Sequence, residues 1–233
     1  MRIGLLQCDH VNAEFQPLVG DYPDLFANLL TPAMPDIELV VYDVTQGQFP
    51  ANVRECEGYI STGSRQSVYD DVAWIHDLSA FVRDLYANQQ KFVGICFGHQ
   101  MIAHALGGEV KKTGRGWGIG VKSVEINQPQ AWMQPAMPAY NLLLSHQDQV
   151  ETLPPDARVI GSNAHCPNSM IVVGEHFLGI QAHPEFTPQY AEALMCSRIE
   201  RIGRETVDQA LATLSTPIDS PAIAQWITAF LGG

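Results

Sequence analysis

The stretch that decides the fold is KFVGICFGHQMIAHALGG, residues 91–108. Its apolar first half predicts a short buried strand over 92–95, and a helix is expected over 98–106. Between the two lies Cys96, with one glycine two residues before it and another two residues after it. This G-x-C-x-G pattern is typical of a nucleophile elbow, a strained strand-to-helix turn in which neighbouring side chains would clash.

An elbow would give Cys96 a chemical role. It would expose the sulfur at the carboxyl edge of the sheet, beside the amino end of the next helix, whose partial positive charge favours the nucleophilic thiolate form. The alternative is a small apolar cysteine packed between strand and helix, the commoner position of a lone cysteine. The flanking glycines alone leave both interpretations open.

Composition limits the classes of function. The chain has 233 residues, 46% hydrophobic and 16% charged, which is typical of one large globular domain. A net charge of −12 argues against nucleic-acid and anionic-membrane partners, because both require basic patches. No apolar run is long enough for a signal peptide or a membrane span. Five widely spaced cysteines without CxxC pairs predict free thiols, no zinc site and a reducing, cytoplasmic location, and no cofactor is expected.

Strands and helices alternate over the first half of the chain, which predicts βαβ units and a parallel sheet. The expected strands are 2–7, 37–43, 58–61 and 92–95, and the expected helices are 21–30, 72–88 and 98–106. After residue 109 short strand-like segments separated by turns predict a meander at one side of the sheet. They are 109–112, 119–126, 140–145, 159–162, 169–173 and 177–181, and helices follow at 188–204, 206–214 and 223–231.

A second stretch with catalytic residue types is QAHPEF, residues 181–186. A thiolate nucleophile needs a general base, and the base needs a third group that fixes its tautomer and orientation. His183 and Glu185 share one face of an extended segment, and Pro184 stiffens that segment. They follow a predicted strand at the edge where Cys96 is also expected. The alternative is an ordinary surface His–Glu pair.

With both motifs in view, residues 1–190 resemble the class I (triad-type) glutamine amidotransferase domain. GICFGHQ (94–100) and HPE (183–185) carry the resemblance, and ISTGSRQSVYDD (60–71), GRGWGIG (114–120) and SHQDQV (145–150) fit by order and distance. Within the family the resemblance is closest to the stand-alone, GMP-synthase-like group, which includes γ-glutamyl peptidases.

The expected fold class is α/β: a single-domain, open, mostly parallel, flavodoxin-like sheet with helices on both faces, a nucleophile elbow and an antiparallel edge extension. We expect one domain over 1–233, with its core over 1–190 and a C-terminal helical extension over 191–233. The extension could dock a partner or a second copy of the chain.

The resemblance implies a role for each matching position. Cys96 would attack the γ-carbonyl carbon, His183 would act as acid and base, and Glu185 would orient His183. The oxyanion would be bound by backbone N–H groups of Phe97 and of Gly63 or Ser64. The expected substrate contacts, largely through backbone groups, are Gln100, Ser145, His146, Gln147 and Asp148. The sequence departs from the family at Arg65, where the oxyanion loop often carries a proline, and the role of this arginine stays open.

Three classes of function remain. The leading one is a cysteine amidase that cleaves the γ-amide of glutamine or of a γ-glutamyl compound through a thioester on Cys96. It would be either a glutaminase serving a separate ammonia-accepting synthetase or a self-contained γ-glutamyl peptidase. No ATP-pyrophosphatase domain is found in the sequence, which slightly favours the self-contained form. The second is a PfpI/DJ-1-like cysteine hydrolase, which Gln100 and the HPE segment disfavour. The third is a binding module with an inactive site, which an intact Cys96, His183 and Glu185 disfavour.

Overall fold

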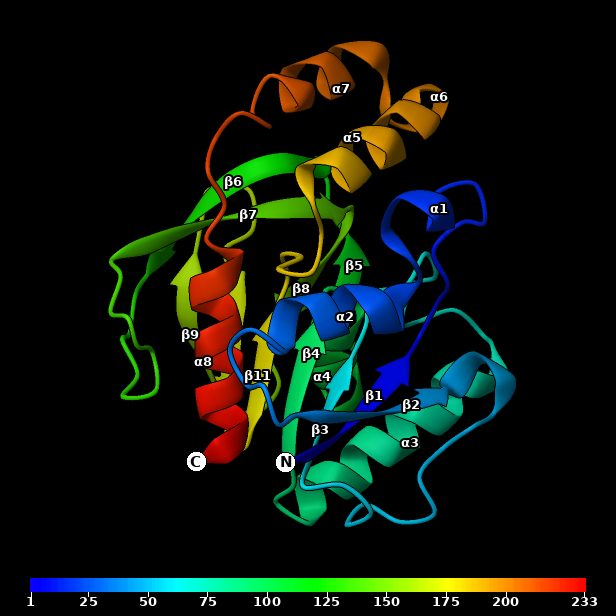
Figure 1. Ribbon diagram of the computed structural model, residues 1–233, viewed down its shortest axis with the longest axis vertical. Coiled ribbons are helices and arrows are strands. Elements are labelled where there is room, and N and C mark those ends of the chain that lie inside the picture. The colour runs from blue at the N-terminus through cyan, green and yellow to red at the C-terminus, as the bar shows by residue number, and fades with distance from the viewer.

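One long mixed sheet forms the centre of the protein, and the computed structural model describes all of residues 1–233 (Figure 1). The strands lie in the order β2-β1-β3-β4-β11-β10-β9-β6-β7. Their bounds are β1 Arg2–Gln7, β2 Glu38–Asp43, β3 Gly58–Ser61, β4 Lys91–Ile95, β6 Gly118–Ile126, β7 Ala139–His146, β9 Ala157–Ser162, β10 Met170–Val173 and β11 Phe177–Ile180. The first five strands in the spatial order are parallel, and the last four continue the sheet antiparallel.

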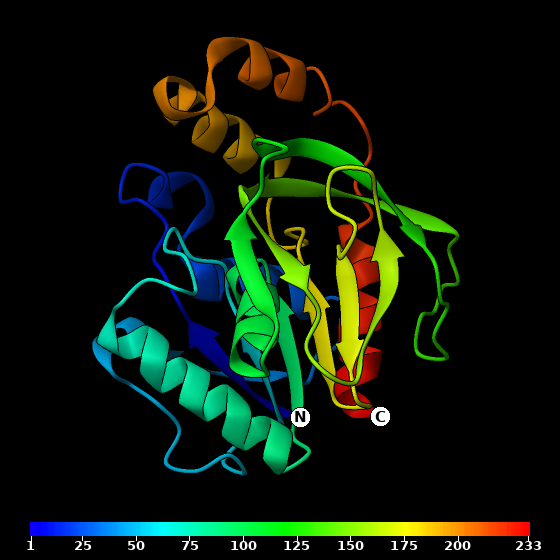
Figure 2. The same cartoon turned by 180° about the vertical axis from the view of Figure 1, so that it is seen from behind.

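Helices cover both faces of this sheet. The helices are α1 Gln16–Val19, α2 Tyr22–Leu30, α3 Ala73–Ala87, α4 Phe97–Ala105, α5 Pro188–Ser197, α6 Ile199–Ile202, α7 Arg204–Leu211 and α8 Ser220–Gly232, with one short 3-10 helix at Val44–Gln46. On one face α2 and α8 pack in a core that includes Phe26 and Trp226. On the other face α3 and α4 pack in a second core that includes Leu78 and Ile102 (Figure 2). The predicted open α/β fold with an antiparallel extension is confirmed.

Local sequence fixes where several of these helices begin. Asp21 caps α2, because its side chain accepts from the Tyr22 backbone N–H. The Asp24 side chain in turn accepts from the Asp21 backbone N–H, which completes a capping box. Thr187 caps α5 through a bond from the Tyr190 N–H, and a proline occupies the first turn. None of the helices combines the length and the apolar character needed to cross a bilayer.

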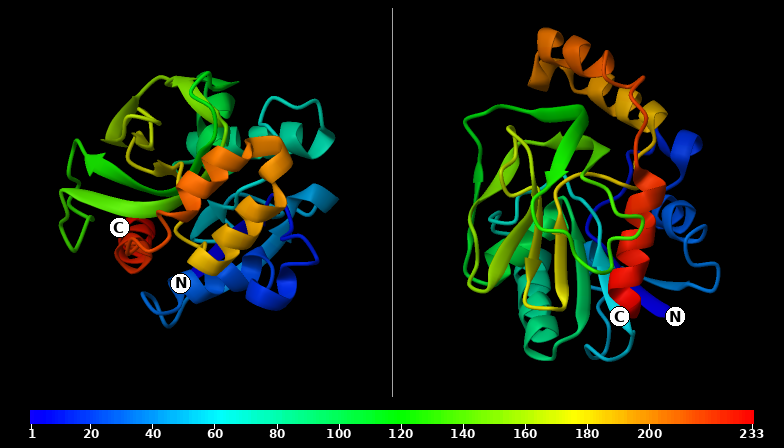
Figure 3. Two further views of the ribbon diagram at one scale, coloured as in Figure 1. Left: turned by 90° about the horizontal axis from the view of Figure 1, so that it is seen from above. Right: turned by 90° about the vertical axis from the view of Figure 1, so that its left-hand side faces the viewer.

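The C-terminal segment departs from the predicted pattern. The helix expected over 188–204 is interrupted, because α5 ends before Arg198 and α6 ends at Gly203, which has a φ of 101°. The helix expected over 206–214 is α7, which begins and ends earlier. Together α5, α6 and α7 lie above the carboxyl ends of the parallel strands (Figures 1 and 3). This segment therefore covers the edge of the sheet at which Cys96 lies.

The antiparallel part is also more elaborate than a meander. Strand β9 pairs with β6 rather than with its chain neighbour β8. A strand that the sequence did not predict, β8 (Asp148–Thr152), pairs with β5 (Glu109–Lys112) in a separate two-stranded sheet. This small sheet places residues 145–148, which join the end of β7 to the start of β8, beside α4.

Candidate active site

Cys96 lies between β4 and α4 in the conformation of an elbow. Its φ of 51° and ψ of −96° are unusual for a residue with a side chain and cost on the order of 1–3 kcal/mol. The flanking glycines are required by close packing. A Cβ added at Gly94 would lie 2.3 Å from the carbonyl carbon and oxygen of Gly98, and one added at Gly98 would lie 1.8 Å from Ser61 Oγ. The predicted strand–Cys–helix turn is therefore confirmed.

His183 and Glu185 follow β11, where the sequence placed them. The His183 backbone N–H donates to the Leu143 carbonyl at 2.8 Å, which ties this segment to β7. The two side chains are buried, with 3% and 0% exposed, and His183 Nδ1 lies 2.7 Å from Glu185 Oε1. The imidazole also stacks on Phe186, with ring centroids 3.9 Å apart.

The charges around His183 determine its protonation. Burial alone would lower the pKa of His183, but the negative charges of Glu185 and of a Cys96 thiolate, with hydrogen bonds to both, outweigh it. They raise the pKa of His183 to about 10. With Nδ1 donating to Glu185, the second ring nitrogen of His183 is available to exchange a proton with Cys96 or with a bound substrate. The three residues of the predicted triad are thus brought together.

The loop after β3 approaches this group closely. A Cβ at Gly63 would lie 2.9 Å from His183 Cε1 and 3.7 Å from Cys96 Cβ, so only a glycine leaves this space open. The Thr62 hydroxyl donates to the Gly63 carbonyl at 2.9 Å, which fixes the orientation of the peptide group between Gly63 and Ser64. The backbone N–H groups of Gly63 and Ser64 have no acceptor in the protein.

Phe97 provides the other predicted oxyanion donor. It is the first residue of α4, so its N–H has no acceptor within the helix. The loop after β3 and the start of α4 thus each carry backbone N–H groups without an acceptor in the protein.

A cleft of about 340 Å³ opens over Cys96, and every predicted substrate contact lines it. The Gln100 side-chain amide donates to the Asp148 carbonyl at 2.9 Å and to Gln181 Oε1 at 3.1 Å. The Asp148 carboxylate accepts from the hydroxyls of Ser67 and Tyr69.

The rest of the 145–148 segment forms part of the same wall. His146 is buried and donates from Nδ1 to the Asp148 carbonyl at 3.1 Å, and burial lowers the pKa of His146 to about 3. A neutral, buried His146 fits a structural role in which the side chain shapes the wall of the cleft. Ser145 Oγ accepts from Arg198 at 3.2 Å, and the Gln147 carbonyl accepts from the Thr113 N–H at 3.1 Å.

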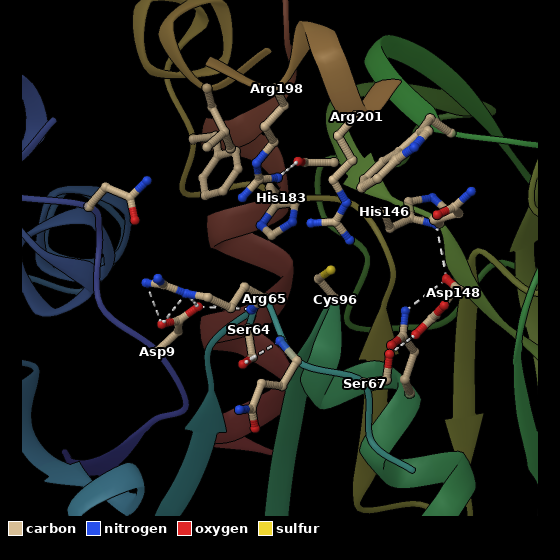
Figure 4. Close-up of a pocket in the computed structure, with 18 of the residues that line it drawn as sticks. Asp9, Ser64, Arg65, Ser67, Cys96, His146, Asp148, His183, Arg198 and Arg201 are labelled. Atoms are coloured by element: carbon tan, nitrogen blue, oxygen red, sulfur yellow. Dashed lines mark hydrogen bonds and ion pairs between the residues drawn. The ribbon is translucent and has the colours of Figure 1, made fainter. Parts of the chain in front are cut away.

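Several lining residues carried no signal in the sequence. Arg65, whose role was open, pairs with Asp9 at 2.8 Å and also donates to the His10 carbonyl. Arg198 and Arg201 reach the cleft from the C-terminal helices (Figure 4). The cleft lining brings together residues as far apart along the chain as Asp9 and Arg201, which no local pattern indicates.

Comparison with known proteins identifies the family of the chain. The sequence model of the glutamine amidotransferase class-I family matches residues 42–199. Gamma-glutamyl peptidase 3 of Arabidopsis thaliana is 29% identical over 188 residues, which cover 76% of this chain and 75% of that protein. The glutamine-hydrolyzing GMP synthase of Bacillus pumilus is 30% identical over 200 residues, 76% of this chain but 38% of that protein.

A solved structure supports the fold. The crystal structure of a glutamine amidotransferase from Thermotoga maritima matches with a TM-score of 0.74 at 18% identity, over 98% of this chain and 96% of that one. The match of the family model extends over most of the chain, from β2 to α6. The chain belongs to the class-I glutamine amidotransferase family.

Proposed function

We propose that the chain is a cysteine-dependent hydrolase that cleaves the γ-amide of glutamine or of a γ-glutamyl compound through a thioester on Cys96. The observation that carries the proposal is the elbow cysteine beside a buried His183–Glu185 pair. Similarity to a γ-glutamyl peptidase and to a glutamine-hydrolyzing GMP synthase supports the same bond as the target.

The chemistry follows from which group holds the proton. The sulfur of Cys96 adds to the γ-carbonyl carbon, and the carbonyl electrons move to an oxyanion that the N–H groups of Phe97 and of Gly63 or Ser64 stabilise. The protonated His183 then gives its proton to the leaving nitrogen as the C–N bond breaks, which releases ammonia or an amine and leaves the γ-glutamyl thioester. Neutral His183 next takes a proton from water, whose oxygen displaces the sulfur and releases the glutamyl acid.

The cleft supplies contacts for the other end of the glutamyl group. The Asp148 carboxylate accepts from two hydroxyls and forms no ion pair within the protein, which leaves it free to pair with an α-ammonium group. Gln100 fixes the position of Asp148 by donating to its carbonyl. We therefore place the α-amino end of the substrate at Asp148 and the γ-carbonyl at Cys96.

A second candidate is a glutaminase that delivers ammonia to a separate synthetase. Similarity to glutamine-hydrolyzing GMP synthases favours it. The two candidates share the thioester chemistry and differ in the leaving group that the cleft accepts.

A paired turnover assay tests the proposal. One arm measures ammonia released from L-glutamine, and the other measures glutamate released from γ-glutamyl peptides. We expect turnover in at least one arm, with Cys96→Ala and His183→Ala each losing on the order of 10⁴-fold or more, because triad residues act as a unit. Cys196→Ala is the matched control, since this exposed cysteine lies outside the cleft. Activity retained by Cys96→Ala would refute the mechanism.

A further inference from the structure

Two guanidinium groups enter the cleft from the C-terminal helices without a carboxylate partner. Arg198 lies between α5 and α6, and Arg201 lies in α6. Arg198 donates to Ser145 Oγ at 3.2 Å, and the Arg201 guanidinium lies over the Trp117 ring, 4.9 Å from its centroid. Neither takes part in an ion pair within the protein.

The other charges of the cleft are arranged differently. Arg65, on the opposite wall, is neutralised by Asp9 through both Nε and Nη2. Lys112 adds another unpaired cation at the exposed rim. Arg198 is half-buried, whereas Arg201 is exposed. A half-buried guanidinium without a counter-ion is unfavourable unless a ligand supplies the charge, and the planar donors of both groups match a carboxylate. The side of the cleft that Arg198 and Arg201 form therefore fits an anionic group.

The position of the pair indicates which part of a substrate it meets. Figure 4 shows Arg198 and Arg201 pointing down toward His183 and Cys96, and Asp148 to the right of Cys96, away from the two arginines. The α-amino end of the glutamyl group is placed at Asp148, and the leaving nitrogen must lie within reach of His183 to receive its proton. Substituents on that nitrogen consequently extend toward the two arginines.

We infer that Arg198 and Arg201 bind a carboxylate on the leaving amine, so that the preferred substrates are γ-glutamyl amino acids and peptides rather than free glutamine. This inference rests on the proposed function. The arginines act on specificity: Arg198 is held in place by Ser145 and Arg201 by Trp117, and both present free N–H groups to the ligand.

The test compares two ligands that differ in one carboxylate, γ-glutamylglycine and γ-glutamylmethylamide. Calorimetric titration of the inactive Cys96→Ala chain gives the affinity for each, and kcat/KM with the active chain gives a second readout. We expect Arg198→Gln and Arg201→Gln each to weaken the binding of γ-glutamylglycine by about ten- to a hundredfold, the usual range for a charge-assisted hydrogen bond. The affinity for γ-glutamylmethylamide should change by less than about twofold. Arg204→Gln is the control, because this exposed arginine of α7 lies outside the cleft.

The other outcomes overturn either the inference or the proposed function. Equal losses for both ligands would place the arginines on the α-carboxylate of the glutamyl group instead. Unchanged affinities, or no binding of γ-glutamylglycine, would exclude the carboxylate site. Arg201→Gln keeps the test decisive if Arg198→Gln fails to fold, because the Arg201 side chain is exposed. Arg-dependent binding without any hydrolysis by the active chain would refute the proposed function alone, and hydrolysis of both compounds without dependence on the arginines would refute this inference alone.

Discussion

Gly98 is the position at which the elbow leaves least space. In a helix, glycine to alanine usually stabilises by about 0.5–1 kcal/mol, and Gly98 does not have a left-handed backbone that would oppose alanine. Its added Cβ, however, would lie 1.8 Å from Ser61 Oγ, and Ser61 is fully buried. We therefore expect Gly98→Ala to lower the free energy of unfolding by about 1–3 kcal/mol, the usual cost of overpacking, instead of raising it.

Removing the obstructing hydroxyl should restore most of this loss. Ser61 Oγ has no hydrogen-bond partner, so Ser61→Ala alone should be close to neutral. In that background the new Cβ of Gly98→Ala keeps contacts of 3.1 Å and 3.2 Å to Ser61 Cβ and O, which require only a small shift. The double variant should lie within about 1 kcal/mol of wild type, with a coupling energy of about 1–2 kcal/mol.

Urea denaturation followed by circular dichroism measures all four corners of this cycle. Gly94→Ala is the contrasting variant, because its Cβ would meet the Gly98 backbone at 2.3 Å and no side-chain change can relieve it. We expect Ser61→Ala to rescue Gly98→Ala but not Gly94→Ala. A Gly98→Ala chain as stable as wild type, or one that Ser61→Ala fails to rescue, would show that this packing does not hold the elbow.

Three substitutions test the catalytic residues themselves. His183 is protonated below its pKa of about 10, so activity that needs this proton should fall as the pH rises through 10. Glu185→Gln removes a charge that raises the pKa of His183, so the alkaline limb of the pH–kcat/KM profile should move to lower pH. An alkaline limb at unchanged pH would show that Glu185 does not raise the pKa of His183. Gly63→Ala brings a Cβ to 2.9 Å from His183 Cε1 and should lower kcat/KM by about 10²-fold while the Tm stays unchanged. Full activity would show that the loop after β3 does not lie this close to His183 in the working enzyme. Gln100→Ala should mainly raise KM, because Asp148 loses its fixed position, and a loss confined to kcat would contradict that role.

Short-range patterns in the sequence predicted much of the fold. The bounds of β1 and β3 agree with the expected ranges, because their apolar residues run nearly continuously between clear turns. Strand β8, DQVET, has too few apolar residues for such a pattern and is a strand because it pairs with β5. The break at Arg198 was missed for a related reason: no glycine or proline marks it, so its position depends on packing over the cleft.

The residues of the candidate site also divide into those that a local motif predicts and those that only long-range contacts bring together. Cys96, His183 and Glu185 could be predicted because each lies in a short motif whose spacing reflects the geometry of an elbow or an extended strand end. The partner of Arg65 could not, because Asp9 is 56 positions away and meets it only after β1 and β3 pair. Arg198 and Arg201 reach the cleft only because the C-terminal helices return over the sheet (Figure 3).

The most direct measurement is peptide mapping of the chain after reaction with a diazoketone analogue of glutamine, which alkylates an activated thiolate with loss of nitrogen. Cys96 is only 5% exposed, whereas Cys196 is exposed, so accessibility alone favours Cys196. We expect one adduct per chain, on Cys96, slowed by added γ-glutamyl substrate and absent from Cys96→Ala. Labelling of Cys196 first, or equal labelling of the Cys96→Ala chain, would contradict a nucleophile at Cys96.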